Sequence, residues 1–311
     1  MTVSWRDALS RRVRGELQRD APLAPRTTIR VGGPADLLVR PADPDALSEL
    51  LRAVRELGVS LSILGGGANT LVADRGVRGV VLRLPADLVP EDPARPFVLG
   101  AGQPTSRLWI RAHALGKVGM EFVAGIPGTL GGAVAMNAGT KIGEMKDVVS
   151  RVELATADGA GFVEAKALGF AYRTCHLPAG AVVTRVEFAL HDGDVQESER
   201  RMQADRDHRR RTQPLDKPTF GSTFVNPPGD FAGRLIEEVG LKGHRVGNAT
   251  WSPVHANFVS NLGGATAKDV LTLVNLARSR VKERFGIVLE TEVRLLGEFL
   301  AEEVGDLRAG A

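Results

Sequence analysis

The chain has 311 residues, 43% hydrophobic and 25% charged, a composition typical of folded globular proteins with room for two or three domains. Forty basic residues against 37 acidic ones leave a net charge of +3, too small to indicate a nucleic-acid partner by itself. The single cysteine, Cys175, excludes an internal disulfide, argues against a zinc site and favours a reducing compartment. With no apolar stretch of membrane-spanning length and no secretory core at the N-terminus, we expect a cytoplasmic protein with no metal and no membrane partner.

Hydrophobic spacing and turn signals predict a chain of mixed helices and strands. Asp43 followed by Pro44 predicts a helix start, and Thr129 predicts the N-cap of a short helix of small residues. The polar helix that ends near residue 211 marks a boundary between two blocks. The predicted helices are 1–20, 44–57, 104–117, 194–211, 231–239 and 268–285. The predicted strands are 27–31, 35–39, 61–64, 80–84, 151–155, 161–164, 182–190, 256–259 and 287–296.

Two glycine-rich loops, 64–70 and 125–139, each follow an apolar run. Glycine lets backbone N–H groups turn toward a ligand with no Cβ in the way, so the pair favours one extended ligand that carries a pyrophosphate. The first loop lacks the G-x-G-x-x-G spacing and no long apolar helix follows it, which argues against a Rossmann site for NAD. The candidate cofactor residues are Leu64, Gly65, Gly66, Gly67, Ala68, Asn69, Thr70, Gly125, Ile126, Pro127, Gly128, Thr129, Gly131, Gly132, Ala133, Asn137 and Gly139.

Three further places carry polar groups that the local pattern does not require. Arg173 follows Tyr172, the only tyrosine, and could bind a carboxylate or phosphate, although a lone surface arginine is the simpler interpretation. Ser222 lies in a turn fixed by prolines and glycine, where an ordinary turn serine is the simpler interpretation from the residues alone. Glu292 shares a predicted strand face with Glu290 and Arg294, a pattern somewhat more typical of a solvated face with a Glu–Arg pair than of a site.

A basic run at 206–211 lies on a short polar helix with acidic residues just upstream and no interleaved aromatic residues. This pattern does not indicate nucleic-acid binding. We expect a solvated face that could touch an anionic substrate.

Taken together, these segments closely resemble the UDP-N-acetylenolpyruvoylglucosamine reductases of bacterial peptidoglycan synthesis. The resemblance covers 27–299, and seven motifs in family order are far more specific than any one of them. The motifs are TTIRVGGPA, LGGGANT, GIPGTLGGAVAMNAG, YRTC, GSTFVNP, GLKGHRVG and LETEVR. Arg173, Ser222 and Glu292 fall at the three positions that the family uses for catalysis, so the resemblance favours the functional interpretation of each.

The resemblance implies an α+β fold. An FAD-binding domain of the vanillyl-alcohol-oxidase-like (PCMH) type would cover 22–192, in subdomains of about 22–85 and 86–192. A C-terminal α+β substrate-binding domain would cover 193–300, with its last strand packing back on the first subdomain. The family divides by a loop that carries a substrate-facing tyrosine. No tyrosine follows Tyr172 here, so the chain resembles the shorter subclass.

The resemblance also assigns further residues. Arg30 would face FAD, and Tyr172, Asn226 and His255 would bind substrate. FAD should be non-covalent, because neither glycine loop contains a histidine or cysteine. We expect a monomer.

The implied reaction reduces UDP-N-acetylglucosamine enolpyruvate to UDP-N-acetylmuramate, with NADPH as the hydride donor. Ser222 would protonate C2 of the enolpyruvyl group, while Arg173 and Glu292 stabilise the enolate. Two alternatives stay open: a related FAD-dependent oxidase or dehydrogenase with another substrate, and a non-catalytic nucleotide-binding module.

Overall fold

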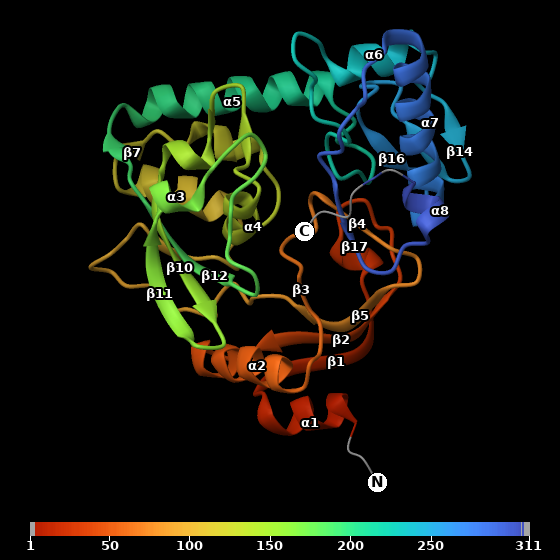
Figure 1. The fold of residues 1–311 in the computed structure, drawn as a ribbon. Coiled ribbons are helices and arrows are strands. Elements are labelled where there is room, and N and C mark those ends of the chain that lie inside the picture. The colour runs from red at the N-terminus through yellow and green to blue at the C-terminus, as the bar shows by residue number, and fades with distance from the viewer. Residues whose placement is uncertain (1–3, 306, 308–311) are drawn as a thin grey trace. The chain divides into compact units, whose positions relative to one another are not determined.

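The computed structural model describes residues 4–305 and 307, and its contacts divide the chain into two compact units (Figure 1). The first unit consists of the chain up to Arg19, Leu37–Gly66 and Gly79–Arg209, and the second of Asp20–Asp36, Gly67–Arg78 and the chain from Arg210 onward. Each unit is therefore assembled from separate stretches of sequence. The domain limits 22–192 and 193–300, which concern cofactor and substrate binding, stay a prediction.

A four-stranded sheet in the order β1-β2-β5-β3 occupies the N-terminal part, and the unit boundaries at Arg19, Asp36 and Arg78 fall inside three of its strands. Helix α2 covers it with apolar residues at helical spacing, because Leu47 and Leu50 pack in one core with Val39 and Val80 (Figure 1). The elements are α1 (Trp5–Arg12), β1 (Gly15–Pro22), β2 (Pro34–Pro41), α2 (Pro44–Glu56), β3 (Leu61–Ile63) and β5 (Val77–Leu82).

The rest of the first unit is built on an antiparallel sheet in the order β11-β10-β12-β6. β10 and β11 form the predicted hairpin, in which Thr156 pairs with Gly159. The strands are β6 (Val98–Gly100), β7 (Lys117–Val118), β8 (Gly139–Thr140), β9 (Gly143–Glu144), β10 (Val149–Thr156), β11 (Gly159–Glu164), β12 (Val182–Phe188) and β13 (His191–Asp192). The helices are α3 (Ser106–Ala114), η2 (Glu121–Gly125), α4 (Leu130–Ala135), η3 (Met145–Asp147), η4 (Ala165–Leu168) and α5 (Val195–Thr212).

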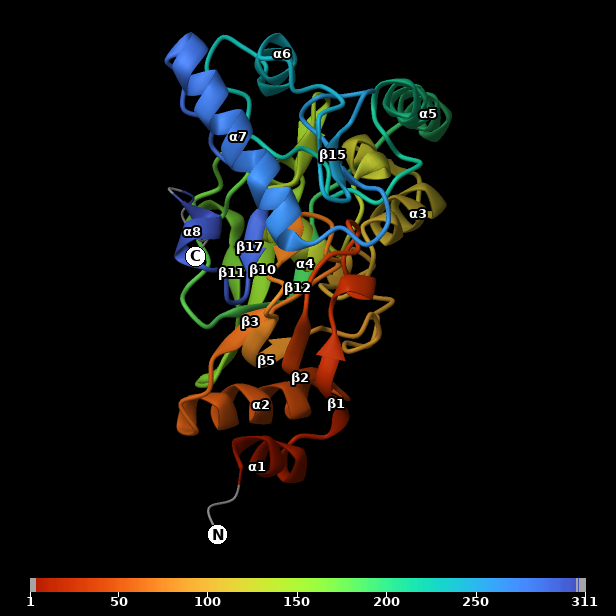
Figure 2. The ribbon, with the colours of Figure 1, turned by 90° about the vertical axis from the view of Figure 1, so that its right-hand side faces the viewer.

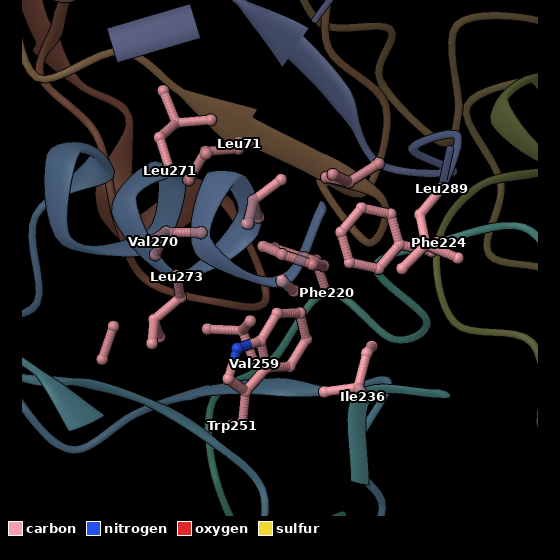
Figure 3. Packing of buried hydrophobic residues seen from close by; sticks show 14 of the residues in the cluster. Leu71, Phe220, Phe224, Ile236, Trp251, Val259, Val270, Leu271, Leu273 and Leu289 are labelled. Carbon is pink, nitrogen blue, oxygen red and sulfur yellow. The ribbon is translucent and has the colours of Figure 1, made fainter. Parts of the chain in front are cut away.

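The second unit packs the long helix α7 against a three-stranded antiparallel sheet, β14-β15-β16 (Figure 2). Near the C-terminus, β17 pairs in parallel with β4, so that Leu295 lies opposite Leu71. The core places the rings of Phe224 and Trp251 in a stack, with centroids 5.9 Å apart (Figure 3). The elements are η1 (Ala24–Arg26), β4 (Thr70–Val72), α6 (Ala232–Glu238), β14 (Arg245–Val246), β15 (Ala249–Trp251), β16 (Val259–Asn261), α7 (Ala267–Phe285), β17 (Arg294–Leu296) and α8 (Ala301–Val304).

Four predicted elements are wrong in whole or in part. The strand predicted over 256–259 overlaps β16 only at Val259, because 256 and 257 lie in a turn. The helix predicted over 1–20 has its residues 1–3 outside the described part of the chain and is otherwise helical only over Trp5–Arg12. Val13 is already extended, and the chain turns at Gly15, with a φ of 137°, into β1 beside β2. The strand predicted over 27–31 is irregular, and Arg30 has a φ of 57°. The strand predicted over 287–296 is regular only in β17.

Within residues 4–305 and 307, no helix combines the length and the apolar character that crossing a bilayer requires.

Candidate active site

The two glycine-rich loops meet in the first unit. A Cβ on Gly65 would lie 2.6 Å from Oγ1 of Thr129, and a Cβ on Gly66 would overlap the Cα of Gly128. The backbones therefore touch at a place where a side chain does not fit. This observation supports the interpretation that the two loops form one backbone-lined cradle, as a pyrophosphate-bearing cofactor requires.

The second loop is held by hydrogen bonds that leave its glycines little freedom. The hydroxyl of Thr129 accepts a bond from the N–H of Gly132, which confirms the predicted N-cap of α4. The N–H of Gly131 donates to the carbonyl of Ala101 at 2.9 Å, and a Cβ on Gly131 would lie 3.0 Å from that of Ala101. These contacts hold the loop through bonds within the protein itself.

Arg173 is connected to the end of this loop. Its Nη2 donates to the carbonyl of Gly139 at 3.0 Å, and its guanidinium lies over the ring of Tyr172, 4.9 Å from the centroid. The turn that carries Arg173 is tethered by Asn137, whose Nδ2 donates to the carbonyl of Ala171 at 2.9 Å. Predicted cofactor and catalytic residues thus form one hydrogen-bonded group in the first unit.

Asn137 is fully buried, and its side chain is used within the protein. Besides Ala171, its Nδ2 donates to Glu144 at 2.7 Å, and its Oδ1 accepts from the N–H of Lys146 at 2.9 Å. The side chain therefore positions the turn of Arg173. A direct side-chain contact with a cofactor stays a prediction.

Backbone strain is concentrated at the predicted site residues. Among residues 4–305 and 307, the non-glycine residues with positive φ are Asp20, Arg30, Asn137 and Arg173. For residues other than glycine and asparagine this conformation costs free energy, and such strain tends to occur at functional positions. The positive φ of Arg30 and Arg173 therefore marks these two arginines, because a long side chain does not favour this conformation.

Ser222 and Glu292 come together in the second unit. The segment that begins at Ser222 is bridged on one side by Phe258 and on the other by Thr291. The N–H of Glu292 donates to the carbonyl of Thr223 at 2.9 Å, so Glu292 is bonded to the residue that follows Ser222. Both Ser222 and Glu292 are half-buried. Residues seventy positions apart are thus held on adjacent backbone segments.

A cavity of about 360 Å³ in the second unit collects Ser222 with the predicted substrate residues Asn226 and His255. Sequence reasoning did not single out Phe231 and Arg234, which line the same cavity. The exposed Phe231 offers an apolar ring and Arg234 a cation. Arg234 is paired with Asp230, and Glu237 also lines the cavity, so the lining combines an apolar ring with charges of both signs.

Two side chains of this cavity also have structural partners. The Oδ1 of Asn226 accepts from the N–H of Ala232 and so caps the first turn of α6. The Nδ1 of His255 accepts from the N–H of Asn257 at 3.2 Å, which requires that this nitrogen carry no proton. Burial, and then the charge of Lys242, lower the pKa of His255, in keeping with a neutral ring.

Three further predicted cofactor residues, Gly67, Asn69 and Arg30, lie in the second unit. The Nδ2 of Asn69 donates to the carbonyl of Glu292 at 2.9 Å. A Cβ on Gly67 would overlap the carbonyl oxygen of Arg26. Arg30 is exposed, and its carbonyl accepts a bond from Asn261 at 3.3 Å.

The expectation of a solvated face for 206–211 is only partly right. Arg210 and Arg211 are exposed. Arg206, however, lies over the ring of Trp109, 5.2 Å from its centroid, and Arg209 packs directly on Gly125. The helical period turns these two arginines inward, a feature that charge composition alone does not reveal.

Asn257 and Asn261 were also not singled out from the sequence. Both are buried, and both use their side-chain amides to bond the backbone of site segments. An isolated asparagine beside a strand carries no sequence signal that distinguishes it from a turn residue.

Comparisons with known proteins identify the family of this chain. The family described as "UDP-N-acetylenolpyruvoylglucosamine reductase, C-terminal domain" matches residues 213–296, and the "FAD binding domain" family matches residues 35–163. A UDP-N-acetylenolpyruvoylglucosamine reductase of Anaeromyxobacter sp. (strain Fw109-5) is 79% identical over 99% of this chain and 97% of its own length. That of Myxococcus xanthus (strain DK1622) is 56% identical over 92% and 94%.

Among solved structures, the UDP-N-acetylenolpyruvylglucosamine reductase (MurB) of Thermus caldophilus matches with a TM-score of 0.78 and 41% identity. The match covers 91% of this chain and 99% of that one. These findings confirm the predicted α+β fold with an FAD-binding domain and a C-terminal domain, and they confirm an FAD-dependent oxidoreductase. The chain belongs to the UDP-N-acetylenolpyruvoylglucosamine reductase family.

Proposed function

We propose that this protein reduces UDP-N-acetylglucosamine enolpyruvate to UDP-N-acetylmuramate with NADPH as the hydride donor, as a cytoplasmic step of peptidoglycan precursor synthesis. The observation that carries the proposal is that Ser222 lines a cavity with Asn226 and His255, while Glu292 is hydrogen-bonded to Thr223, the residue that follows Ser222. Family membership supports the reaction, and the glycine cradle supports the cofactor.

The cradle of Gly65, Gly66, Gly128 and Thr129 would hold the FAD pyrophosphate, with Arg30 as a further contact. Bound FAD, once reduced, supplies the hydride that C3 of the enolpyruvyl group receives. Neither glycine loop contains a nucleophilic histidine or cysteine, so the cofactor should be released when the protein is denatured.

The chain's own residues manage the charge and the proton. When C3 gains a hydride, negative charge develops toward C2 and the carboxylate. Arg173 offers forked N–H donors to that charge. Glu292 can help only if it is protonated or shares a proton with the carboxylate. Ser222 gives its proton to C2, which completes the addition of one hydride and one proton across the double bond.

Tyr172, Asn226 and His255 are proposed to bind substrate. His255 can offer only its Nε2 side to the cavity, because its Nδ1 is bonded to Asn257. The absence of any tyrosine after Tyr172 supports placing the chain in the shorter subclass.

The visible spectrum of the purified protein tests this proposal. We expect a yellow flavoprotein whose absorbance is bleached by NADPH under anaerobic conditions and restored by the enolpyruvyl sugar nucleotide. The matched control is UDP-N-acetylglucosamine, which lacks the double bond and should restore nothing. A flavin that NADPH cannot bleach would favour another flavin enzyme, and a protein that binds no flavin would contradict the proposal altogether.

A further inference from the structure

We propose that Asn257 is a positioning residue that fixes Ser222 relative to Glu292. This inference rests on the proposed function, because it concerns the residues that would handle the proton and the enolate. Asn257 is 3% exposed and belongs to no motif used above to assign the site.

The side chain of Asn257 makes two hydrogen bonds to the backbone of Phe224. Its Oδ1 accepts from the N–H of Phe224 at 3.0 Å, and its Nδ2 donates to the carbonyl of the same residue at 2.8 Å. The side-chain amide thereby bonds the N–H and the carbonyl of Phe224 as the backbone of a neighbouring strand would. The backbone of Asn257 adds a third bond, because its carbonyl accepts from the N–H of Thr223 at 2.8 Å.

These bonds connect Asn257 to the backbone beside both Ser222 and Glu292. Thr223 follows Ser222, and its carbonyl accepts from the N–H of Glu292 at 2.9 Å. On the far side, the N–H of Val225 donates to the carbonyl of Glu290 at 2.9 Å. The segment 222–225 is thus bonded to Asn257 on one side and to the segment 290–292 on the other, so a shift at Asn257 displaces Ser222 and Glu292 relative to each other.

The ring of Phe224 makes the clamp rigid. It is 1% exposed and stacks on Trp251 in the core of the second unit (Figure 3). The core fixes the ring of Phe224, and the amide of Asn257 fixes its backbone. Together they determine the position of residue 224 along the segment. A nonpolar residue at 257 would leave the buried N–H and carbonyl of Phe224 without these partners. A satisfied buried amide of this kind specifies a single arrangement.

The experiment separates the two half-reactions in a stopped-flow spectrometer. For Asn257→Ala we expect unchanged FAD content and unchanged flavin reduction by NADPH. Flavin reoxidation by the enolpyruvyl substrate should slow by ~10–10²-fold, the loss caused by displacing a reacting group by about 1 Å. Asn257→Asp is the second variant, since it keeps an acceptor for the N–H of Phe224 but loses the donor to its carbonyl. Asn257→Asp should also slow flavin reoxidation. It provides the test of the proposal if Asn257→Ala does not fold.

Asn275→Ala is the matched control. Its Nδ2 donates to the carbonyl of Glu303 at 2.8 Å, so the variant also loses a side-chain bond to backbone in the second unit, but between α7 and the segment of α8. We expect both half-reactions of this variant to match the unmodified protein.

A double-mutant cycle with Ser222→Ala distinguishes positioning from general damage. If Asn257 acts through Ser222, adding Asn257→Ala to Ser222→Ala should slow reoxidation much less than it does in the unmodified protein. The same fold-loss in both backgrounds overturns the inference, and so does normal reoxidation in Asn257→Ala. Normal reoxidation in Ser222→Ala alone overturns the proposed role of Ser222, a separate result that removes the basis of the inference as well.

Discussion

Ser222, Arg173 and Glu292, the proposed catalytic residues, show how little of a residue's surroundings can be predicted from the sequence next to it. Each has an ordinary alternative in the sequence: a turn serine, a surface arginine, and a solvated glutamate. The structure bonds Arg173 to Gly139 at the end of a glycine loop and places Glu292 against the residue after Ser222. The proposed chemistry then assigns a different task to each, with only Ser222 giving a proton to carbon.

Replacement of Ser222 by alanine tests this division of tasks. We expect Ser222→Ala to leave flavin reduction by NADPH largely intact and to slow reduction of the enolpyruvyl group by ~10²–10⁴-fold, the usual range for a positioned proton donor. Rapid kinetics of the two half-reactions measures this. Thr219→Ala is a nearby control, because the hydroxyl of Thr219 accepts a bond from the N–H of Gly221 and has no proposed part in the reaction. Equal loss of both half-reactions in a folded, FAD-loaded Ser222→Ala would refute the role.

The glycine cradle makes a second prediction at this scale. A Cβ on Gly66 would overlap the Cα of Gly128, so Gly66→Ala must push the two loops apart. We expect weaker FAD binding, measured by flavin retention on dialysis. Gly161→Ala is the control, since a Cβ there meets nothing within 4 Å. Equal flavin retention in the two variants would show that the two loops need not touch.

At the scale of elements, local signals predicted the long helices and the hairpin well. Helix α2 begins at Pro44 with Asp43 as its cap, as predicted, because the carboxylate accepts from the N–H of Ala46 at 2.8 Å. Helix α7 begins within one residue of its predicted start. Such elements follow from residues a few positions apart, which interact with one another regardless of the rest of the fold.

The start of α7 offers a prediction for an element. Thr266 and Asp269 form a capping box, in which the hydroxyl of Thr266 accepts from the N–H of Asp269 at 3.0 Å. Thr266→Ala should lower the free energy of unfolding by ~0.5–2 kcal/mol. Thr272→Ala is matched, because Thr272 lies inside the same helix and bonds the carbonyl of Lys268. Urea unfolding should show the smaller change for Thr272→Ala, since alanine favours helix interiors. The reverse order would contradict the capping argument.

At the scale of the whole molecule, the division into two units does not follow the order of the sequence. The second unit takes Asp20–Asp36 and Gly67–Arg78 from the N-terminal part of the chain and joins them to the C-terminal part. Its core contains Ile29 and Leu71 together with the residues of α7. The C-terminal stretch alone therefore lacks part of its own core.

Leu71 tests this dependence. It is fully buried and belongs to the same core cluster as Leu271 of α7 (Figure 3). Leu71→Ala should lower the free energy of unfolding of the second unit by ~2–5 kcal/mol, through lost burial and the cavity left behind. Leu215→Ala is the control, because Leu215 is 53% exposed in the same unit and should change stability by about 0.5 kcal/mol or less. Equal effects in urea unfolding would mean that the early segments do not stabilise the second unit.

The sequence by itself determined the helices with clear periodicity, the hairpin, the glycine loops and, through ordered motifs, the family. Only the tertiary structure decided that 27–31 is irregular, that two glycine backbones touch, and that Asn257 grips Phe224 from 33 positions away. The physical reason is the separation along the chain of the residues that interact. Caps, periods and turns depend on neighbours along the chain, whereas a buried amide finds its partner only after the core has brought distant segments together.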